Sequence, residues 1–195
     1  EAYRRIGYNA RFESFPGLRS LVMANKGESD GDVARIAGTE KEFPNLIPVP
    51  TPVIFFNGMA FTKNVTREIK EWKDLEGLKI GIIRGIRYSE IGTRDLSRYY
   101  AEDMTHLFKL LDQNRIQVAI AVSMAAKIEI SKNFKNSGIK EIGKALFSAP
   151  LYHYVNKRNK HLVPELNRVL QEMKEQKEIE KIIETFLLDA ESKTP

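Results

Sequence analysis

Cysteine is absent from the 195 residues of this chain. Its absence excludes disulfides, thiolate zinc sites and cysteine nucleophiles. It fits an oxidising compartment, but many cytosolic chains also lack cysteine, so it does not define the location. The chain also has no apolar run close to the roughly 20 residues that a membrane-spanning helix needs, and we expect no membrane insertion.

The short motifs that mark common catalytic and cofactor sites are missing as well. There is no GxxxxGK[ST] phosphate loop, no GxGxxG fingerprint, no HExxH and no GxSxG. The three histidines, His106, His153 and His161, are far apart and lie near no carboxylate pattern. We therefore predict that the protein binds no metal and no cofactor, and no residue pattern positions a catalytic acid–base pair.

Charge of one sign is only slightly in excess. The formal net charge is +5, and opposite charges alternate in segments such as KEWKDLEGLK and EMKEQKEIEK. Nucleic-acid-binding proteins usually concentrate positive charge in a patch, whereas alternation is typical of solvated helix faces. We predict no nucleic-acid partner, while a mild preference for anionic ligands stays open.

Short apolar segments alternate with amphipathic ones along the chain. We expect strands at residues 8–13, in DVARIAG, IFFNGMAFTKN, LKIGIIRG and IQVAIAVSM, and in the segment KEIGKALFSAPLYHYVNKR. Helices are expected near Leu18–Val22, ending at Gly27, from Ile86 through Tyr100, near Leu107–Leu111, after Ser123, and as a pair in the C-terminal third. This alternation predicts an α/β fold with mostly parallel sheets.

Proline marks the first of two places where the chain is expected to cross between domains. The segment EFPNLIPVPTPV holds four of the eight prolines and should run extended. With a second crossing at SAPLY, near residues 148–152, it divides the chain. We predict a discontinuous lobe of residues 1–54 and 151–195, and a second lobe of residues 55–150.

Three blocks of the sequence resemble family 3 extracellular solute-binding proteins, the receptor components of bacterial ABC importers for amino acids and similar small polar solutes. The blocks are LRSLVMANKGESDGDVAR, WKDLEGLKIGIIRG and the C-terminal stretch from LFSAPLYHYVNKR to the last helices. They occur in the family's order from about Tyr8 onward. The resemblance implies a two-lobed type II periplasmic-binding-protein-like fold, with a mostly parallel sheet in each lobe and two hinge crossings. It also implies a periplasmic or extracytoplasmic location.

The chain departs from the family in three ways. It begins on EAYRRIGYNARF, so the family's first strand is missing, and we expect an export signal to have been removed before residue 1. In the block GTEKEF, the acidic Glu42 stands near the position where the family places an arginine that holds a carboxylate. The strand IQVAIAVSM is followed by Ser123, where many members have an acid.

The candidate ligand-binding residues are Phe15, Arg35, Gly85, Arg87, Tyr88 and Ser123. A guanidinium at the end of the DVAR strand could hold a carboxylate bidentately, or could pair with Asp30 or Asp32. Gly85 and the residues that follow it resemble the ligand loop of the second lobe, where backbone N–H groups could meet an anion.

The aromatic and hydroxyl candidates each have a second interpretation. Phe15 lies where the family stacks an aromatic ring on its ligand, or it packs in the core. Ser123 could offer its hydroxyl to a ligand, or it caps a helix.

The resemblance implies binding of a small polar or anionic solute, amino acid-like or a small carboxylate, in a cleft between the lobes. The implied partner is an ABC permease. One alternative is a ligand-sensing ectodomain or orphan receptor of the same fold. Another is a small-molecule dehydratase-like enzyme, for which Glu90 and Glu42 are the available acid–base residues.

Overall fold

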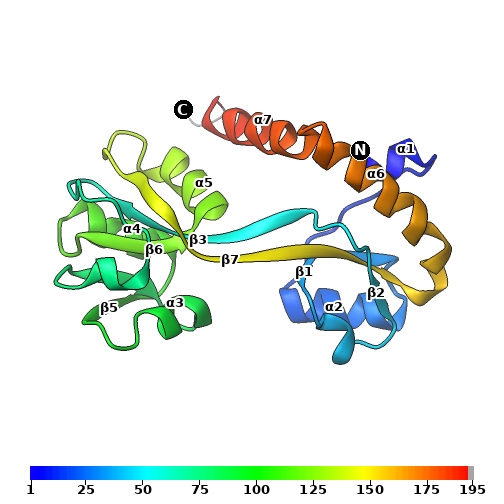
Figure 1. The fold of residues 1–195 in the computed structure, drawn as a ribbon, viewed down its shortest axis with the longest axis horizontal. Coiled ribbons are helices and arrows are strands. Elements are labelled where there is room, and N and C mark those ends of the chain that lie inside the picture. Colours follow the sequence, from blue (N-terminus) through cyan, green and yellow to red (C-terminus); the bar gives the residue numbers. More distant parts are fainter. Residues whose placement is uncertain (193–195) are drawn as a thin grey trace. The chain divides into compact units, whose positions relative to one another are not determined.

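The computed structural model describes residues 1–192, with side chains described as far as residue 188 (Figure 1). The strands are β1 (Gly31–Ile36), β2 (Leu46–Pro48), β3 (Ile54–Thr62), β4 (Ile80–Ile83), β5 (Arg98–Ala101), β6 (Val118–Val122) and β7 (Lys140–Asn156). The α-helices are α1 (Ala2–Arg5), α2 (Gly17–Lys26), α3 (Arg87–Gly92), α4 (Met104–Asp112), α5 (Ser123–Asn133), α6 (Val163–Glu175) and α7 (Glu178–Ser192).

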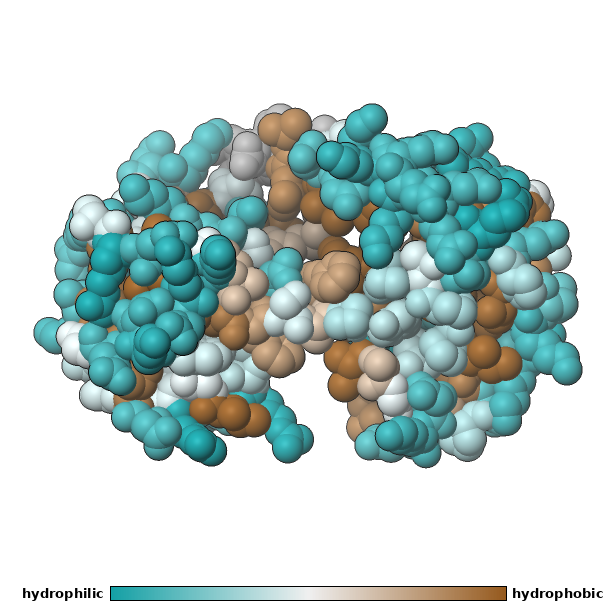
Figure 2. Space-filling view, in the orientation of Figure 1, coloured by the Kyte–Doolittle hydropathy of each residue, from teal (hydrophilic) through white to brown (hydrophobic). Residues whose placement is uncertain are grey.

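The chain folds into two compact units. Unit 1 comprises Glu1–Phe55 and Ala149–Ile183, and unit 2 comprises Phe56–Ser148 with the C-terminal residues from Glu184. The long strands β3 and β7 each contribute residues to both units (Figure 1). On the face in Figure 2, hydrophilic residues cover much of each unit's surface, with patches of hydrophobic residues showing between them.

Unit 2 has the parallel core that the sequence predicts. Strand β4 pairs in parallel with β5 on one side and with β6 on the other, and β3 pairs antiparallel with β6. Strand β6 is the apolar run VAIAV, which is almost entirely buried, as expected for a strand covered on both faces. Helix α4 begins after Asp103, whose side chain accepts a hydrogen bond from the His106 N–H at 2.7 Å.

Unit 1 is built differently around the end of β7. Both β1 and β2 pair antiparallel with β7, with Gly31 opposite Val155 and Leu46 opposite Asn156. The parallel pairing expected of each lobe is found in unit 2, whereas in unit 1 both short strands run antiparallel to β7. Helix α6 packs on this side through buried residues at helical spacing: Leu166, Val169, Leu170 and Met173.

Two local expectations were wrong. The segment 8–13 forms no strand and pairs with no sheet. Its aromatic side chains Tyr8 and Phe12 are exposed. The sequence also predicted a helix continuing to Tyr100, but α3 ends at Gly92 and β5 follows. The β-favouring tyrosines Tyr99 and Tyr100 gain backbone partners there from β4.

Helix α2 ends where the sequence pattern predicts, but the residues that it buries differ from those expected. Gly27 ends the helix in the left-handed conformation, with φ of 79°. Leu18 and Val22, however, are exposed, and the helix buries Ala24. None of the helices in the described residues has both the length and the apolar composition that crossing a bilayer requires.

Candidate functional site

The carboxyl ends of β4 and β6 define one edge of the unit 2 sheet. The two strands are parallel neighbours, with Ile80 opposite Val118, so the loop after Ile83 and the first turn of α5 lie at the same edge. In open α/β sheets, ligands bind outside the carboxyl ends of the strands. Four of the six predicted site residues, Gly85, Arg87, Tyr88 and Ser123, follow these two strand ends.

Tyr88 belongs to an aromatic cluster at this edge. Its ring is stacked on Phe147, with centroids 5.2 Å apart and planes at 25°, and it meets Phe56 edge-on at 5.4 Å. The ring also lies directly over Gly58, where any side chain would collide with it. Gly58 in turn pairs with Val122, the last residue of β6. The cluster thus covers the strand ends on which the candidate site depends.

The hydroxyl of Tyr88 is buried and has no hydrogen-bond partner among the described residues. Burial raises the pKa of this phenol well above its ordinary value, so the group stays protonated and can donate a hydrogen bond. A buried polar atom without a partner is rare and costs stability. The Tyr88 hydroxyl is therefore an unused donor below the surface beside the strand ends, and a ligand can reach it only when the aromatic cluster opens.

Ser123 is the first residue of α5 and does not cap it. Its hydroxyl donates instead to Glu141 Oε2 at 2.5 Å, and the same oxygen lies 3.4 Å from Lys127 Nζ. Sequence reasoning missed Glu141, because no motif surrounds it and only the path of β7 brings it to the end of β6. An acid therefore accompanies Ser123 after all, although it comes from another strand.

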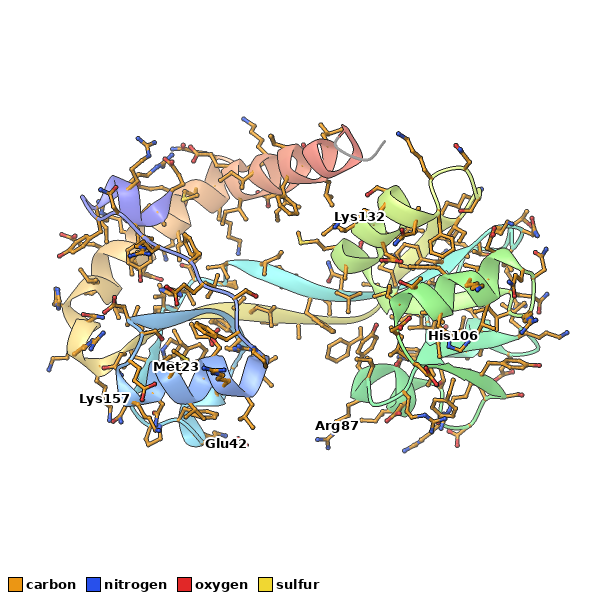
Figure 3. All side chains as sticks on the ribbon, turned by 180° about the vertical axis from the view of Figure 1, so that it is seen from behind. Met23, Glu42, Arg87, His106, Lys132 and Lys157 are labelled. Atoms are coloured by element: carbon orange, nitrogen blue, oxygen red, sulfur yellow. The ribbon has the colours of Figure 1, made fainter. Side chains whose placement is uncertain are left out.

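The loop after β4 is held by its own helix. Gly85 has φ of 81°, and its N–H donates to Glu90 Oε1 at 2.8 Å. This bond satisfies the backbone group that was predicted to meet an anion, and it gives Glu90 a structural role. Arg87 is exposed and points away from the body of unit 2 (Figure 3). Arg84 lies over the ring of Tyr100, at 4.6 Å from its centroid.

Arg35, in unit 1, forms the alternative contact that its sequence position allowed. Its Nε donates to Asp32 Oδ1 at 2.8 Å, and one of its terminal nitrogens donates to Asp32 Oδ2 at 3.0 Å and to the Gly17 carbonyl at 3.1 Å. Asp32 is buried and also accepts a bond from the Ser20 hydroxyl. The guanidinium thus ties β1 to the start of α2.

Phe15 also lies near the start of α2, half-buried, with the Arg19 guanidinium 5.5 Å from its ring centroid. Glu42 is exposed at the periphery of unit 1 (Figure 3). The predicted residues therefore form two groups, Phe15 with Arg35 in unit 1 and the remaining four in unit 2. No cluster of three or more potential metal ligands occurs among the described residues.

Comparisons with known proteins place this geometry in a structural class. No family model matches the chain. A protein of Shewanella oneidensis described as uncharacterized is 28% identical over 182 residues, which cover 90% of this chain and 69% of that protein.

Two solved structures are similar over nearly the whole chain. The second substrate-binding domain of a putative amino acid ABC transporter from Streptococcus pneumoniae has a TM-score of 0.74 at 17% identity, covering 95% of this chain and 85% of that one. The L-cystine solute receptor of Neisseria gonorrhoeae, in its unliganded open conformation, has a TM-score of 0.73 at 17% identity, covering 90% and 74%.

The chain has the type II periplasmic-binding-protein fold, an α/β architecture with a mixed sheet. The fold class predicted from the sequence is confirmed, and the fold is shared with the substrate-binding domain and the solute receptor named above.

Proposed function

We propose that this protein binds a small polar or anionic solute outside the cytoplasm and delivers it to an ABC permease. The proposed ligand is amino acid-like or a small carboxylate. The observation that carries the proposal is the unit 2 edge, where the unpartnered Tyr88 hydroxyl and the Ser123–Glu141 pair lie at the carboxyl ends of β4 and β6. The cleft expected between the two lobes remains a prediction, and the proposal rests on unit 2.

The polar groups at this edge support a ligand with both donors and acceptors. Glu141 and the Ser123 oxygen can accept hydrogen bonds, while Tyr88 can donate one. Arg87 offers a cation without an ion-pair partner among the described residues. The apolar faces of Phe56 and Phe147 border the same site. Such a mixture of apolar walls and a few placed polar groups is typical of small-molecule sites.

We propose binding without chemical conversion of the ligand. Of the two carboxylates that a dehydratase-like reaction could use, Glu90 is engaged by the Gly85 N–H, and Glu42 is exposed and belongs to unit 1, whereas the proposed site is in unit 2. The two structural neighbours are a substrate-binding domain and a solute receptor, which supports the same choice.

Calorimetric titration with acidic, neutral and basic amino acids and with small dicarboxylates tests the proposal. We expect saturable binding of at least one neutral or acidic compound and a loss of about tenfold or more in affinity in Ser123→Ala or Tyr88→Phe, since each lost hydrogen bond costs about 1–3 kcal/mol. Lys132→Ala, an exposed lysine on α5, is the control and should bind as the wild type does.

The outcome decides both the site and the ligand class. Tight binding of a basic amino acid with no response to any acid would overturn the preference for anionic solutes. Binding that is unchanged in both site variants would overturn the unit 2 edge as the site.

A further inference from the structure

A cavity of unit 2 lies at the edge of its sheet opposite the candidate solute site, where the parallel strands begin. It has a volume of about 420 Å³ and is bordered by residues that precede β4 and β6 and follow β3. Because β4 and β6 are parallel, this edge is separated from Gly85 and Ser123 by the length of the strands. The proposed solute site does not use any of its lining residues.

The floor of the cavity is apolar. Leu111, near the end of α4, and Ile116, just before β6, close its bottom and are each 1% exposed, so the apolar surface that a ligand can reach belongs mainly to the half-buried Val65. An apolar floor of this kind favours a ligand with a short hydrocarbon body, since each buried CH₂ contributes about 0.8 kcal/mol.

The polar rim consists of amide and ammonium groups. Gln117 uses its Oε1 to accept the Lys79 backbone N–H at 2.9 Å, which leaves its amide NH₂ without a partner among the described residues. Asn114 likewise uses its Oδ1 to accept a bond from Asn64 at 3.3 Å. With their oxygens occupied, the amides of Gln117 and Asn114 have N–H groups left to donate, and the Asn64 amide oxygen remains as an acceptor.

The two lysines of the rim differ in whether a carboxylate neutralises their positive charge. Lys63 Nζ lies 2.9 Å from Asp112 Oδ1 and 3.1 Å from the Asp112 carbonyl, so its charge is compensated at the end of α4. Lys79 is exposed and has no ion pair within the described part of the chain. No carboxylate lines the cavity, so the positive charge of Lys79 is not neutralised there.

The rim is also rigidly held. The Gln117 backbone N–H donates to the Lys79 carbonyl at 2.7 Å, and the Thr62 hydroxyl donates to the Gln117 carbonyl at 2.7 Å. Asn114 has φ of 57°, a left-handed conformation that few residues other than glycine adopt. A preorganised rim lowers the entropy lost when a ligand binds.

We propose that this cavity binds a small carboxylate with a short hydrocarbon chain. The hydrocarbon chain would lie against Val65, above the buried Leu111 and Ile116, and the carboxylate would accept hydrogen bonds from Lys79 and Gln117. This site is distinct from the proposed solute site and does not depend on it.

Sodium hexanoate is a suitable probe, followed by backbone-amide NMR on the full chain at constant ionic strength. We expect saturable shifts of the amides of Lys79, Asn114 and Gln117 in the wild type. n-Hexanol has the hydrocarbon chain without the negative charge. Sodium acetate and inorganic phosphate carry the charge without the hydrocarbon chain. Each should bind at least about tenfold more weakly than hexanoate, because each lacks one of the two contributions.

Two variants and one control locate the binding. Lys79→Ala should weaken hexanoate about tenfold, and Gln117→Glu should abolish binding by placing a carboxylate on the rim while keeping an oxygen for the Lys79 N–H. Lys73→Ala, which removes an exposed lysine paired with Glu71, should have no effect. The Gln117→Glu spectrum itself reports whether that variant is folded.

Three results would overturn the proposal. The first is the absence of saturable shifts at these amides. The second is equal binding of phosphate and hexanoate, which would mean that the hydrocarbon chain contributes nothing to binding. The third is an equal response of Lys79→Ala and Lys73→Ala. Amino acid titrations at the solute site are read from separate amides, those of Gly85 and Ser123, so the failure of one site leaves the other testable.

Discussion

Arg35 and Asp32, three residues apart on β1, form a two-pronged ion pair in which Nε lies 2.8 Å from Oδ1 and a terminal nitrogen lies 3.0 Å from Oδ2. The carboxylate is 6% exposed. The β-strand register with β7 shifts between these two residues, so the bulge allows both side chains to meet. The arginine that the sequence suggested for a ligand is therefore bound within its own unit.

Replacement of Arg35 should destabilise unit 1. We expect Arg35→Ala to lower the free energy of unfolding by about 2–4 kcal/mol, because it leaves a buried carboxylate with only the Ser20 bond. Arg35→Lys should recover only part of this loss, because lysine keeps the positive charge but its ammonium cannot form the two-pronged contact. Urea unfolding measures both.

Arg168→Ala is the control for this prediction. It breaks an exposed pair with Glu172 one helical turn away, which should cost less than about 1 kcal/mol. If Arg35→Ala and Arg168→Ala had equal effects, the Asp32 pair would not be the stabilising contact described above.

Tyr88→Phe should stabilise the ligand-free protein while weakening ligand binding. The variant removes a buried hydroxyl without a partner and keeps the ring stacked on Phe147, so we expect a gain of about 1 kcal/mol or more in unfolding free energy. Thermal unfolding with and without ligand measures the two effects. A loss of stability in the ligand-free variant would mean that the hydroxyl has a partner.

Gly143 and Gly138 form a matched pair of glycines with nearly equal φ, 73° and 74°. A Cβ at Gly143 would collide with the Ile69 carbonyl, whereas nothing lies near one at Gly138. Gly138→Ala should cost about 1–2 kcal/mol through backbone strain alone. Gly143→Ala should cost about 1–3 kcal/mol more, because the neighbouring backbone must move.

Chemical denaturation of the two glycine variants checks this difference. Lys144 donates its N–H to the same Ile69 carbonyl at 2.8 Å, so the clash should also disrupt this bond. Equal destabilisation by the two substitutions would contradict the close approach of the two backbones.

His153 should make the stability of unit 1 fall at acidic pH. Its Nδ1 lies 2.9 Å from the Asp32 carbonyl, which can only accept, so Nδ1 carries the proton and Nε2 accepts from the Tyr3 hydroxyl at 2.7 Å. Burial lowers the pKa of this imidazole below its ordinary value. The unfolded chain therefore binds a proton more readily than the folded one.

The sign of the effect follows from that difference. Above the ordinary histidine pKa of about 6.5, this residue contributes no pH dependence; below it, stability declines by at most about 1.4 kcal/mol per pH unit until the folded histidine also titrates. His153→Gln should reduce the slope of unfolding free energy between about pH 6.5 and 5. The exposed His161→Gln serves as the control, and an unchanged slope in His153→Gln would refute the assignment.

Local sequence patterns predicted most of the secondary structure, because periodicity and chain breakers act on neighbouring residues. The run VAIAV predicted the buried strand β6, Gly27 predicted the end of α2, and spaced apolar residues predicted α6. The order of these elements also predicted the fold class. These features depend on neighbouring residues, which a sequence displays directly.

The contacts between distant side chains, in contrast, depend on the tertiary structure. It paired Arg35 with Asp32 instead of leaving it free, brought Glu141 to Ser123, and placed the Tyr88 ring over Gly58. It also put β7 between β1 and β2, so that both short strands of unit 1 pair with the same long strand. Each of these contacts depends on strand pairing or on the path of a distant segment, which no local pattern in the sequence records.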